Sequence, residues 1–179
     1  MKTCQERKER MFKKGEYIIY GSSGVCEIMD VTTMKMSDVP EDKLYYILRP
    51  CQVKDSEIFI PVDNKKIKMR RVLKAKEIKA LLNQFPALEE LEIPKEKFRE
   101  TIYKECIRSG DFVQNMRLIK LLLKRKKKRL SQGKNFPSVD ERYLKMVETI
   151  LFSEISHGLE ISQKEMKTIF FRNIKETAK

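Results

Sequence analysis

The sequence predicts an α+β protein with two domains, in which a small N-terminal β-barrel precedes an all-α domain. Up to residue 66 the apolar residues occur in short runs bounded by turn formers, and beyond it they recur at helical spacing. The net charge changes at the same place. Residues 1–66 carry 12 Lys and Arg against 11 Asp and Glu, whereas residues 67–179 carry 27 against 15, so 12 of the 13 excess positive charges lie in the helical half.

The composition excludes a membrane protein. Of the 179 residues, 36% are charged and 41% are hydrophobic, and no apolar stretch is long enough to cross a bilayer. No apolar signal segment follows the basic residues near the N-terminus. We therefore expect a soluble cytoplasmic protein that makes no membrane contact.

Catalytic and metal sites are not expected either. The single histidine, His157, cannot form a two-histidine metal site, and its place before Gly158 indicates a helix C-terminus, where a histidine complements the helix dipole. The four cysteines form no CxxC pair. No combination of nucleophile, base and oxyanion donors is recognisable. We expect a protein that is not an enzyme and uses no cofactor.

The elements of the first half follow from short β-branched and aromatic runs. Strands are expected over residues 17–20, 25–34, 43–48 and 57–61. Residues 21–24, Gly-Ser-Ser-Gly, form a turn between the first two strands, because they lack the Gly-Lys-Ser/Thr of a phosphate-binding loop and lead into a strand. Four or five short strands at this spacing are typical of a small barrel.

The second half shows helix start and stop signals. Helices are expected over 75–85, where Pro86 ends the first, and over 94–107. Asp111 opens a long helix with one apolar face. Two further helices begin with capping boxes, Ser138 with Glu141 and Ser162 with Glu165.

Six consecutive cations, residues 124–129, end the long helix. At about 100° per residue they encircle the helix, so we expect this segment to project into solvent on every side. Such a segment is either a solvated helix end, where the helix dipole favours cations, or a contact for phosphates. The high density of positive charge favours the phosphate contact. A second group of cations between residues 65 and 79 is equally compatible with a hydrophilic linker and with a second contact surface.

Several segments resemble the bacterial CarD family of transcription regulators. Residues 12–25 are similar to the family's opening strand and Gly-containing turn, and residues 57–64 are similar to its strand that ends in Pro-Val/Ala-x-Asn. Segments that look like its helical half are residues 109–111, 140–144 and 150–154. The resemblance covers residues 11 to 175 and extends to the polymerase-binding module of the transcription-repair coupling factor.

The resemblance implies a fold and a function. It implies a Tudor- or SH3-like barrel that binds the β-subunit of RNA polymerase by strand-to-strand contact. It also implies a basic helical domain that binds promoter DNA at the upstream edge of the melted region and modulates the stability of the open complex. The expected domains are a polar tail (1–10), the barrel (11–66), a basic linker with a short helix (67–93) and the DNA-binding domain (94–179). We expect a monomer.

The polymerase contact implied by the resemblance falls on the second and fourth strands. The residues assigned to it are Met34, Ile58, Phe59 and Ile60. Apolar residues stand at Met34 and Phe59, where some family members have arginine, so the contact is expected to depend on backbone pairing and burial. Phe59 is either an exposed residue of an edge strand or an ordinary core phenylalanine.

The DNA contact is assigned to the helical half. Family members place a tryptophan wedge before the Ser-Gly-Asp of residues 109–111, and this chain has no tryptophan. Phe98 either supplies a weaker wedge or the wedge is absent. The residues assigned to DNA are Phe98, Arg99, Lys120, Lys124, Arg125, Lys126, Lys127, Lys128, Arg129 and Arg142.

An alternative function is an RNA-binding or ribosome-associated module. A small barrel followed by lysine-rich helices suits structured RNA as well as DNA, and composition does not separate the two.

Overall fold

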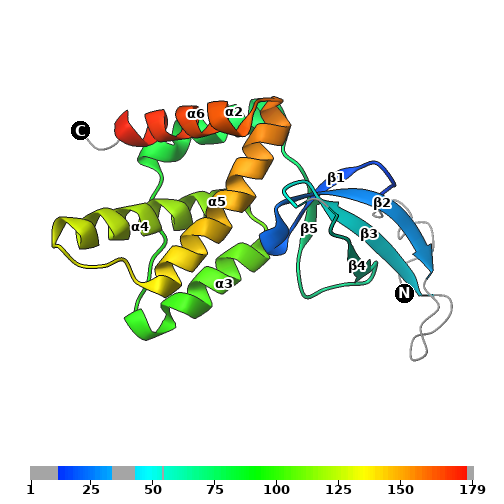
Figure 1. Cartoon of the computed structure of the whole chain (residues 1–179), viewed down its shortest axis with the longest axis horizontal. Helices are drawn as coiled ribbons and strands as arrows, with labels where there is room; N and C mark the ends of the chain where they lie inside the picture. The colour runs from blue at the N-terminus through cyan, green and yellow to red at the C-terminus, as the bar shows by residue number, and fades with distance from the viewer. Residues whose placement is uncertain (1–11, 34–42, 54, 177–179) are drawn as a thin grey trace.

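A computed structural model describes residues 12–33, 43–53 and 55–176, with side chains described as far as residue 170. An antiparallel sheet forms one end of the molecule and a group of helices forms the other (Figure 1). The strands are β1 (Tyr17–Tyr20), β2 (Val25–Thr33), β3 (Leu44–Pro50), β4 (Ile58–Pro61) and β5 (Met69–Arg71). The helices are α2 (Ala75–Gln84), α3 (Arg99–Ser109), α4 (Phe112–Ser131), α5 (Ser138–Leu159) and α6 (Gln163–Glu176), with 3-10 turns η1 (Gly21–Ser23), η2 (Phe85–Ala87) and η3 (Glu96–Phe98).

The five strands have the order β4-β3-β2-β1-β5, so the last strand of the chain returns beside the first. The α+β class is therefore confirmed. The sheet has two edges, β4 and β5, and the closed Tudor-like barrel stays a prediction. The expected end of the β unit at residue 66 is too early, because Met69–Arg71 pairs with β1. The sequence Met69-Arg70-Arg71 contains one apolar residue and so shows no alternation of apolar and polar residues. For this reason the sequence alone predicts a linker here.

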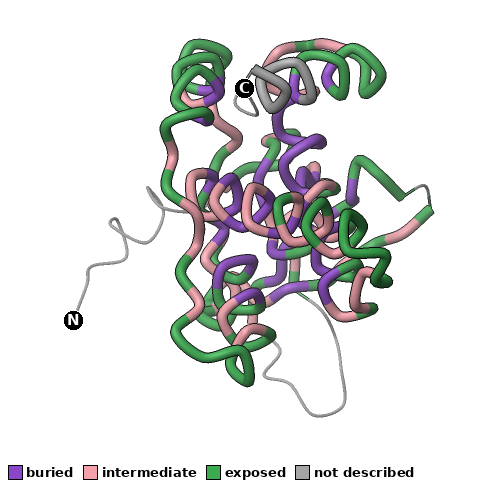
Figure 2. The backbone as a smooth tube through the Cα atoms, turned by 90° about the vertical axis from the view of Figure 1, so that its left-hand side faces the viewer, coloured by how far each residue is buried: buried purple, intermediate pink, exposed green. Residues whose placement is uncertain are grey.

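Each half has its own hydrophobic cluster. In the sheet, inward-facing residues of four strands pack together: Ile18, Cys26, Ile28, Tyr46, Leu48 and Ile60. In the helices, the apolar stripes of α4 and α5 form a larger cluster that α2, α3 and α6 cover. Figure 2 shows these buried segments gathered at the centre of the molecule and the exposed turns around them. The apolar face expected on α4 is confirmed as core, and α5 contributes a buried face beside it.

The helix start expected at Ser138 is confirmed, and two of the three predicted N-terminal caps are confirmed. Asp111 precedes α4 and its Oδ1 accepts a hydrogen bond from the Gln114 amide at 2.7 Å. Ser162 and Glu165 form a reciprocal capping box before α6. The box expected at Ser138 is wrong, because Ser138 is already the first helical residue and Pro137 occupies the cap position without a side-chain hydrogen bond.

The turn η1 packs against the middle of α5. The amide of Val25 donates a hydrogen bond of 3.3 Å to Oγ of Ser153, and this bond is buried. Gly24 has φ of +68°, and a Cβ at this position would collide with the same Ser153 hydroxyl. The glycine of this turn thus allows the sheet to approach α5 closely.

A buried carboxylate on α5 binds the edge strand β5. Glu154 is 0% exposed, and its two oxygens accept hydrogen bonds of 2.5 and 2.8 Å from the two Nη atoms of Arg70. The amide of Leu73 donates a third bond, of 3.1 Å. Arg70 also donates from Nε to the carbonyl of Gly110, between α3 and α4. One arginine therefore fixes the sheet to α5 and to the junction between α3 and α4.

We predict that Glu154→Gln lowers the free energy of unfolding by about 3 kcal/mol, because it leaves the partly buried Arg70 without its countercharge. Urea unfolding followed by circular dichroism measures this. Glu141→Gln removes an exposed i,i+4 pair with Lys145 and serves as the control, for which we expect a change below about 0.5 kcal/mol. Equal losses for the two variants would contradict the central role of Glu154.

Candidate functional site

The strand β4 presents an open edge to solvent. The amide of Val62 donates to the carbonyl of Leu44, and in an antiparallel ladder such pairs recur at every second residue. Ile60 and Ile58 therefore bond to β3, and the N–H and C=O of Phe59 point away from the sheet. Pro61, which has no N–H to lose, is typical of an edge position.

The strand at the opposite edge of the sheet, β5, is bound to the helical half through a side chain. The side chain of Arg70 on β5 binds Gly110 and Glu154 of the helical half. Because an exposed strand edge is a template for pairing with another chain, proteins usually cover the edges that they do not use. Of the two edges among the described strands, β4 is the one that remains available for a partner.

The polymerase residues predicted from the resemblance have different environments. Phe59 is 46% exposed and lies on the outward face opposite Ile47, so the exposed edge residue is the correct one of the two alternatives for it. Ile60 is buried in the sheet core and Ile58 packs against that core. Their side chains are therefore part of the fold, and only their strand is available to a partner. Met34 lies outside the described residues.

The expectation that residues 124–129 are solvated on all sides is wrong. Lys124 forms an ion pair of 2.7 Å with Glu90, and Arg125 contacts Glu96 and Asp140. Arg129 donates from Nε to the carbonyl of Asn135 at 3.1 Å. The segments before α3 and before α5 fold back against the last turns of α4, and their acids and carbonyls take up half of the basic run.

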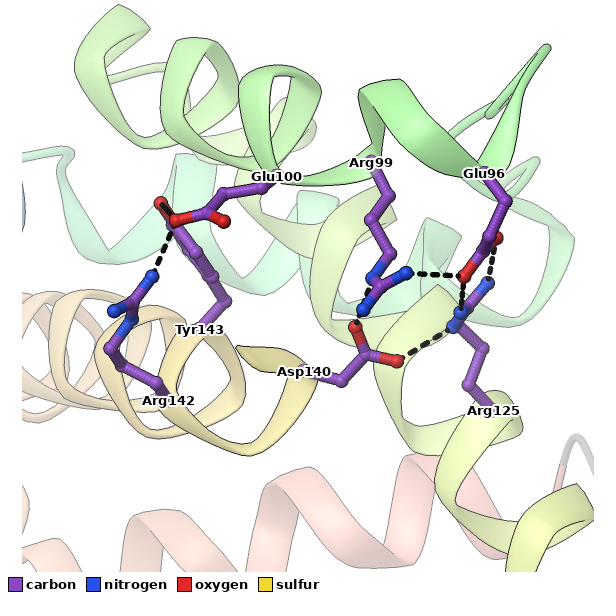
Figure 3. A network of polar contacts seen from close by, with 7 residues as sticks. All are labelled: Glu96, Arg99, Glu100, Arg125, Asp140, Arg142 and Tyr143. Atoms are coloured by element: carbon purple, nitrogen blue, oxygen red, sulfur yellow. Dashed lines mark hydrogen bonds and ion pairs between the residues drawn. The ribbon is translucent and has the colours of Figure 1, made fainter. Parts of the chain in front are cut away.

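A network of two arginines and two acids joins η3, α3, α4 and α5 (Figure 3). Asp140 is 1% exposed and lies between Arg99, at 3.2 Å, and Arg125, at 3.0 Å. Glu96 contacts the same two arginines at 3.0 and 2.5 Å. The hydrogen bond from Arg125 lowers the pKa of the Glu96 carboxyl. The four charges cancel, so Arg99 and Arg125 organise the site and contribute little net field.

Lys120 has a structural role. Its ammonium donates to the carbonyls of Phe85, Pro86 and Leu88, at 3.3, 2.8 and 2.6 Å. Arg117, one turn earlier on α4, binds the carbonyls of Glu89 and Glu90. These cations hold the chain between α2 and η3 along α4. The assignment of Lys120 to DNA is therefore not supported by its position.

Besides Lys124 and Phe98, three of the residues assigned to DNA are exposed. Arg142 is exposed although it donates to Glu100 at 2.5 Å. Lys127 and Lys128 are exposed and form no ion pair with a described residue. Lys126, by contrast, is half-buried with its ammonium 5.9 Å from the centroid of the Phe136 ring.

Phe98 is a surface aromatic at the last residue of η3. It is 48% exposed, and the ammonium of Lys97 lies 5.0 Å from its ring centroid. Lys104 and Arg108 on α3 are also exposed, and their spacing of four residues places them on one side of this helix, which Glu100 shares. This second row of cations was missed in the sequence, where the spacing of Lys104 and Arg108 was the signal.

The row continues into the loop between β4 and β5. Arg108 donates to the carbonyl of Lys66 at 3.0 Å, and Lys65, Lys66 and Lys68 are exposed. Of the second group of cations, Arg70 belongs to the junction, whereas these three lysines extend the basic surface of α3. The described residues thus offer two surfaces: the apolar edge at β4, and a basic surface along α3 that includes Phe98.

Comparison with known protein families gives a match for the part of the chain that contains the sheet. Residues 12–73 match the family model described as the CarD-like/TRCF RID domain. This segment, about a third of the chain, is therefore similar to a CarD-like/TRCF RID domain. The match contains all five strands, β5 included. The chain matches no curated protein. Among the described residues, no helix is long and apolar enough to span a membrane.

We predict that Glu96→Gln lowers stability at pH 7 by less than about 1 kcal/mol, because Glu96 is largely exposed. The native pKa of Glu96 is depressed, so its contribution is complete above the ordinary carboxyl pKa of about 4.3 and is lost as the pH falls through the native value. Urea unfolding of both proteins between pH 3 and 7 measures this. A difference that grew toward low pH would contradict the network.

Proposed function

We propose that this protein is a transcription regulator that links RNA polymerase to promoter DNA. The carrying observation is the combination, in one chain, of a CarD-like domain with an open strand edge and a helical half with a separate basic surface. The role requires two simultaneous contacts and no catalytic step.

The edge of β4 suits strand addition by the polymerase β-subunit. Phe59 offers one N–H and one C=O to an incoming strand, and its ring offers apolar area on the same edge. The contact then gains affinity from main-chain hydrogen bonds and from burial of the Phe59 ring. No charged side chain needs to be desolvated at Phe59, in contrast to relatives with arginine.

The basic surface suits a duplex held mainly through phosphates. Lys97, Lys104 and Arg108 lie beside an exposed aromatic ring, and the lysines of the β4–β5 loop extend the row toward the sheet. Each neutralised phosphate releases counterions, so binding should be strongly salt-dependent and little dependent on sequence. Phe98 at the end of this surface is in a position to contact a distorted base step, as apolar wedges do in the minor groove.

Regulation then follows from mass action. If the protein binds the open complex more tightly than the closed complex, it shifts the equilibrium by the difference between these two affinities, which for such coupling is about 1–3 kcal/mol. The polymerase contact supplies affinity for both complexes. The contact of Phe98 with a distorted step supplies the difference.

We predict that Phe59→Asp weakens binding to the isolated polymerase β-subunit at least tenfold, because it places a charge on the edge that the partner strand must cover. Calorimetric titration measures the affinity, and circular dichroism verifies the fold. Leu130→Asp, at an exposed apolar residue of α4, is the matched control and should bind normally. Normal binding by folded Phe59→Asp would refute the β4 edge as the contact.

The same material tests the alternative of RNA binding. Capture of polymerase subunits from a nuclease-treated bacterial lysate supports the polymerase function. Capture of ribosomal RNA that disappears with nuclease would support the RNA-binding module instead.

We predict that Phe98→Ala shortens the lifetime of the open complex about fivefold or more, since stacking of a base on an aromatic ring contributes about 1–3 kcal/mol. The lifetime is measured by competitor challenge with purified polymerase and a promoter fragment. Ile169→Ala, at an exposed apolar residue of α6, is the control and should leave the lifetime unchanged. An unchanged lifetime for Phe98→Ala would show that DNA is held through phosphates without a wedge.

A further inference from the structure

A hollow lies beside η3, where the ends of α4 and α5 meet. Its volume is about 460 Å³, and the charged residues that line it are Glu96, Arg99, Arg125, Lys128, Arg129 and Asp140. Four of these residues are cations and two are acids. The hollow therefore carries a net charge of about +2. None of these six residues belongs to the hydrophobic core of the helical half.

The charges in the hollow are of two kinds. Arg99 and Arg125 are paired with Glu96 and Asp140, as Figure 3 shows, and form its neutral wall. Lys128 is exposed and has no hydrogen bond or ion pair from its ammonium to any residue that the structure describes. Arg129 donates only its Nε, to Asn135, and its two terminal nitrogens have no such partner among those residues. The excess charge thus resides in an ammonium and an arginine fork.

The helix ends at the hollow do not cancel this charge. The C-terminus of α4 contributes about half a negative charge and the N-terminus of α5, at Pro137, about half a positive charge. No side chain caps the start of α5. An ammonium and an arginine fork at the mouth of a hollow match the oxygens of a phosphate group, which arginine binds in a bidentate manner.

We propose that this hollow is a phosphate-binding site, in which Lys128 and Arg129 hold one backbone phosphate of the DNA that Phe98 contacts. Phe98 lies between Glu96 and Arg99 in the chain, and both line the hollow. A phosphate of the strand that flanks the contacted base step therefore lies within reach of the hollow. This proposal rests on the proposed DNA function and adds the residues that would set the position of the duplex.

The test compares two pairs of substitutions that remove the same charge. Lys128→Gln with Arg129→Gln removes the cations of the hollow. Lys76→Gln with Lys79→Gln removes two exposed lysines of α2, which packs near the C-terminal end of α5, whereas the hollow lies at its N-terminal end. The 22 residues of α5 span about 33 Å, and the two pairs lie near its opposite ends. Affinity for a promoter duplex is measured between 50 and 200 mM salt.

We expect the hollow variant to bind at least tenfold more weakly at 100 mM salt, and the slope of log K against log salt to fall by about 0.9, because the two cations hold one phosphate. The α2 variant should retain the slope of the unsubstituted protein. Equal changes in both variants would overturn the site, because they would show that only the long-range field matters.

Two further arms separate the possible failures. If the unsubstituted protein does not bind the duplex, the proposed DNA function fails. If it binds and loses affinity with Phe98→Ala while the hollow variant behaves like the α2 variant, only the phosphate site is overturned. Titration with inorganic phosphate, monitored by NMR, tests a free anion as the source. Millimolar binding that requires Lys128 and Arg129, with duplex affinity independent of them, would overturn the assignment to DNA.

Discussion

The buried carboxylate of Glu154 is the constraint on which the arrangement of the two halves depends. A carboxylate with no exposure must be paired, because an unpaired buried charge costs several kcal/mol. Its partner, Arg70, lies on a strand of only three residues that has little apolar surface of its own. The ion pair therefore fixes β5 against α5, and β5 in turn completes the sheet beside β1. Together with the packing of Gly24 against Ser153, this contact determines the position of the β4 edge relative to the helices.

The second charge network explains where the excess of positive charge can act. Each ion pair within the fold is neutral, so the +13 of the chain must appear on cations that have no acidic partner. Around Asp140 and Glu90, three cations of α3 and α4 are neutralised. The positive charges without an acidic partner therefore lie on the last turn of α4 and on the exposed side of α3. The positive charge expected in one basic run is therefore divided between two groups, and Phe98 belongs to the group on α3.

Much of the fold could be predicted from the sequence, because periodicity and capping are local properties. The strands β1 to β4, the apolar stripes of α4 and α5, and the caps at Asp111 and Ser162 needed only neighbouring residues. Features that depend on distant partners were missed. The strand β5 is defined by β1 and Glu154, and the neutralisation of Arg125 depends on Asp140, 15 residues away. Phe59 lies in a run of three apolar residues, so the pattern does not show which of them face solvent. The exposure of Phe59 follows only from the position of β4 at the edge of the sheet.

A rigid connection between two weak surfaces has a consequence for selectivity. When one contact is made, the second becomes intramolecular, and its effective concentration depends on whether the spacing of the two targets matches the spacing of the two surfaces. A flexible linker would tolerate many paths of the DNA past the polymerase. The bidentate Arg70–Glu154 pair and the close approach of Gly24 to Ser153 restrict the relative position of the two halves, so fewer such paths are compatible with both contacts. Under the proposed function, this geometry selects the promoter state in which DNA passes the polymerase at that spacing, without a sequence-specific base contact.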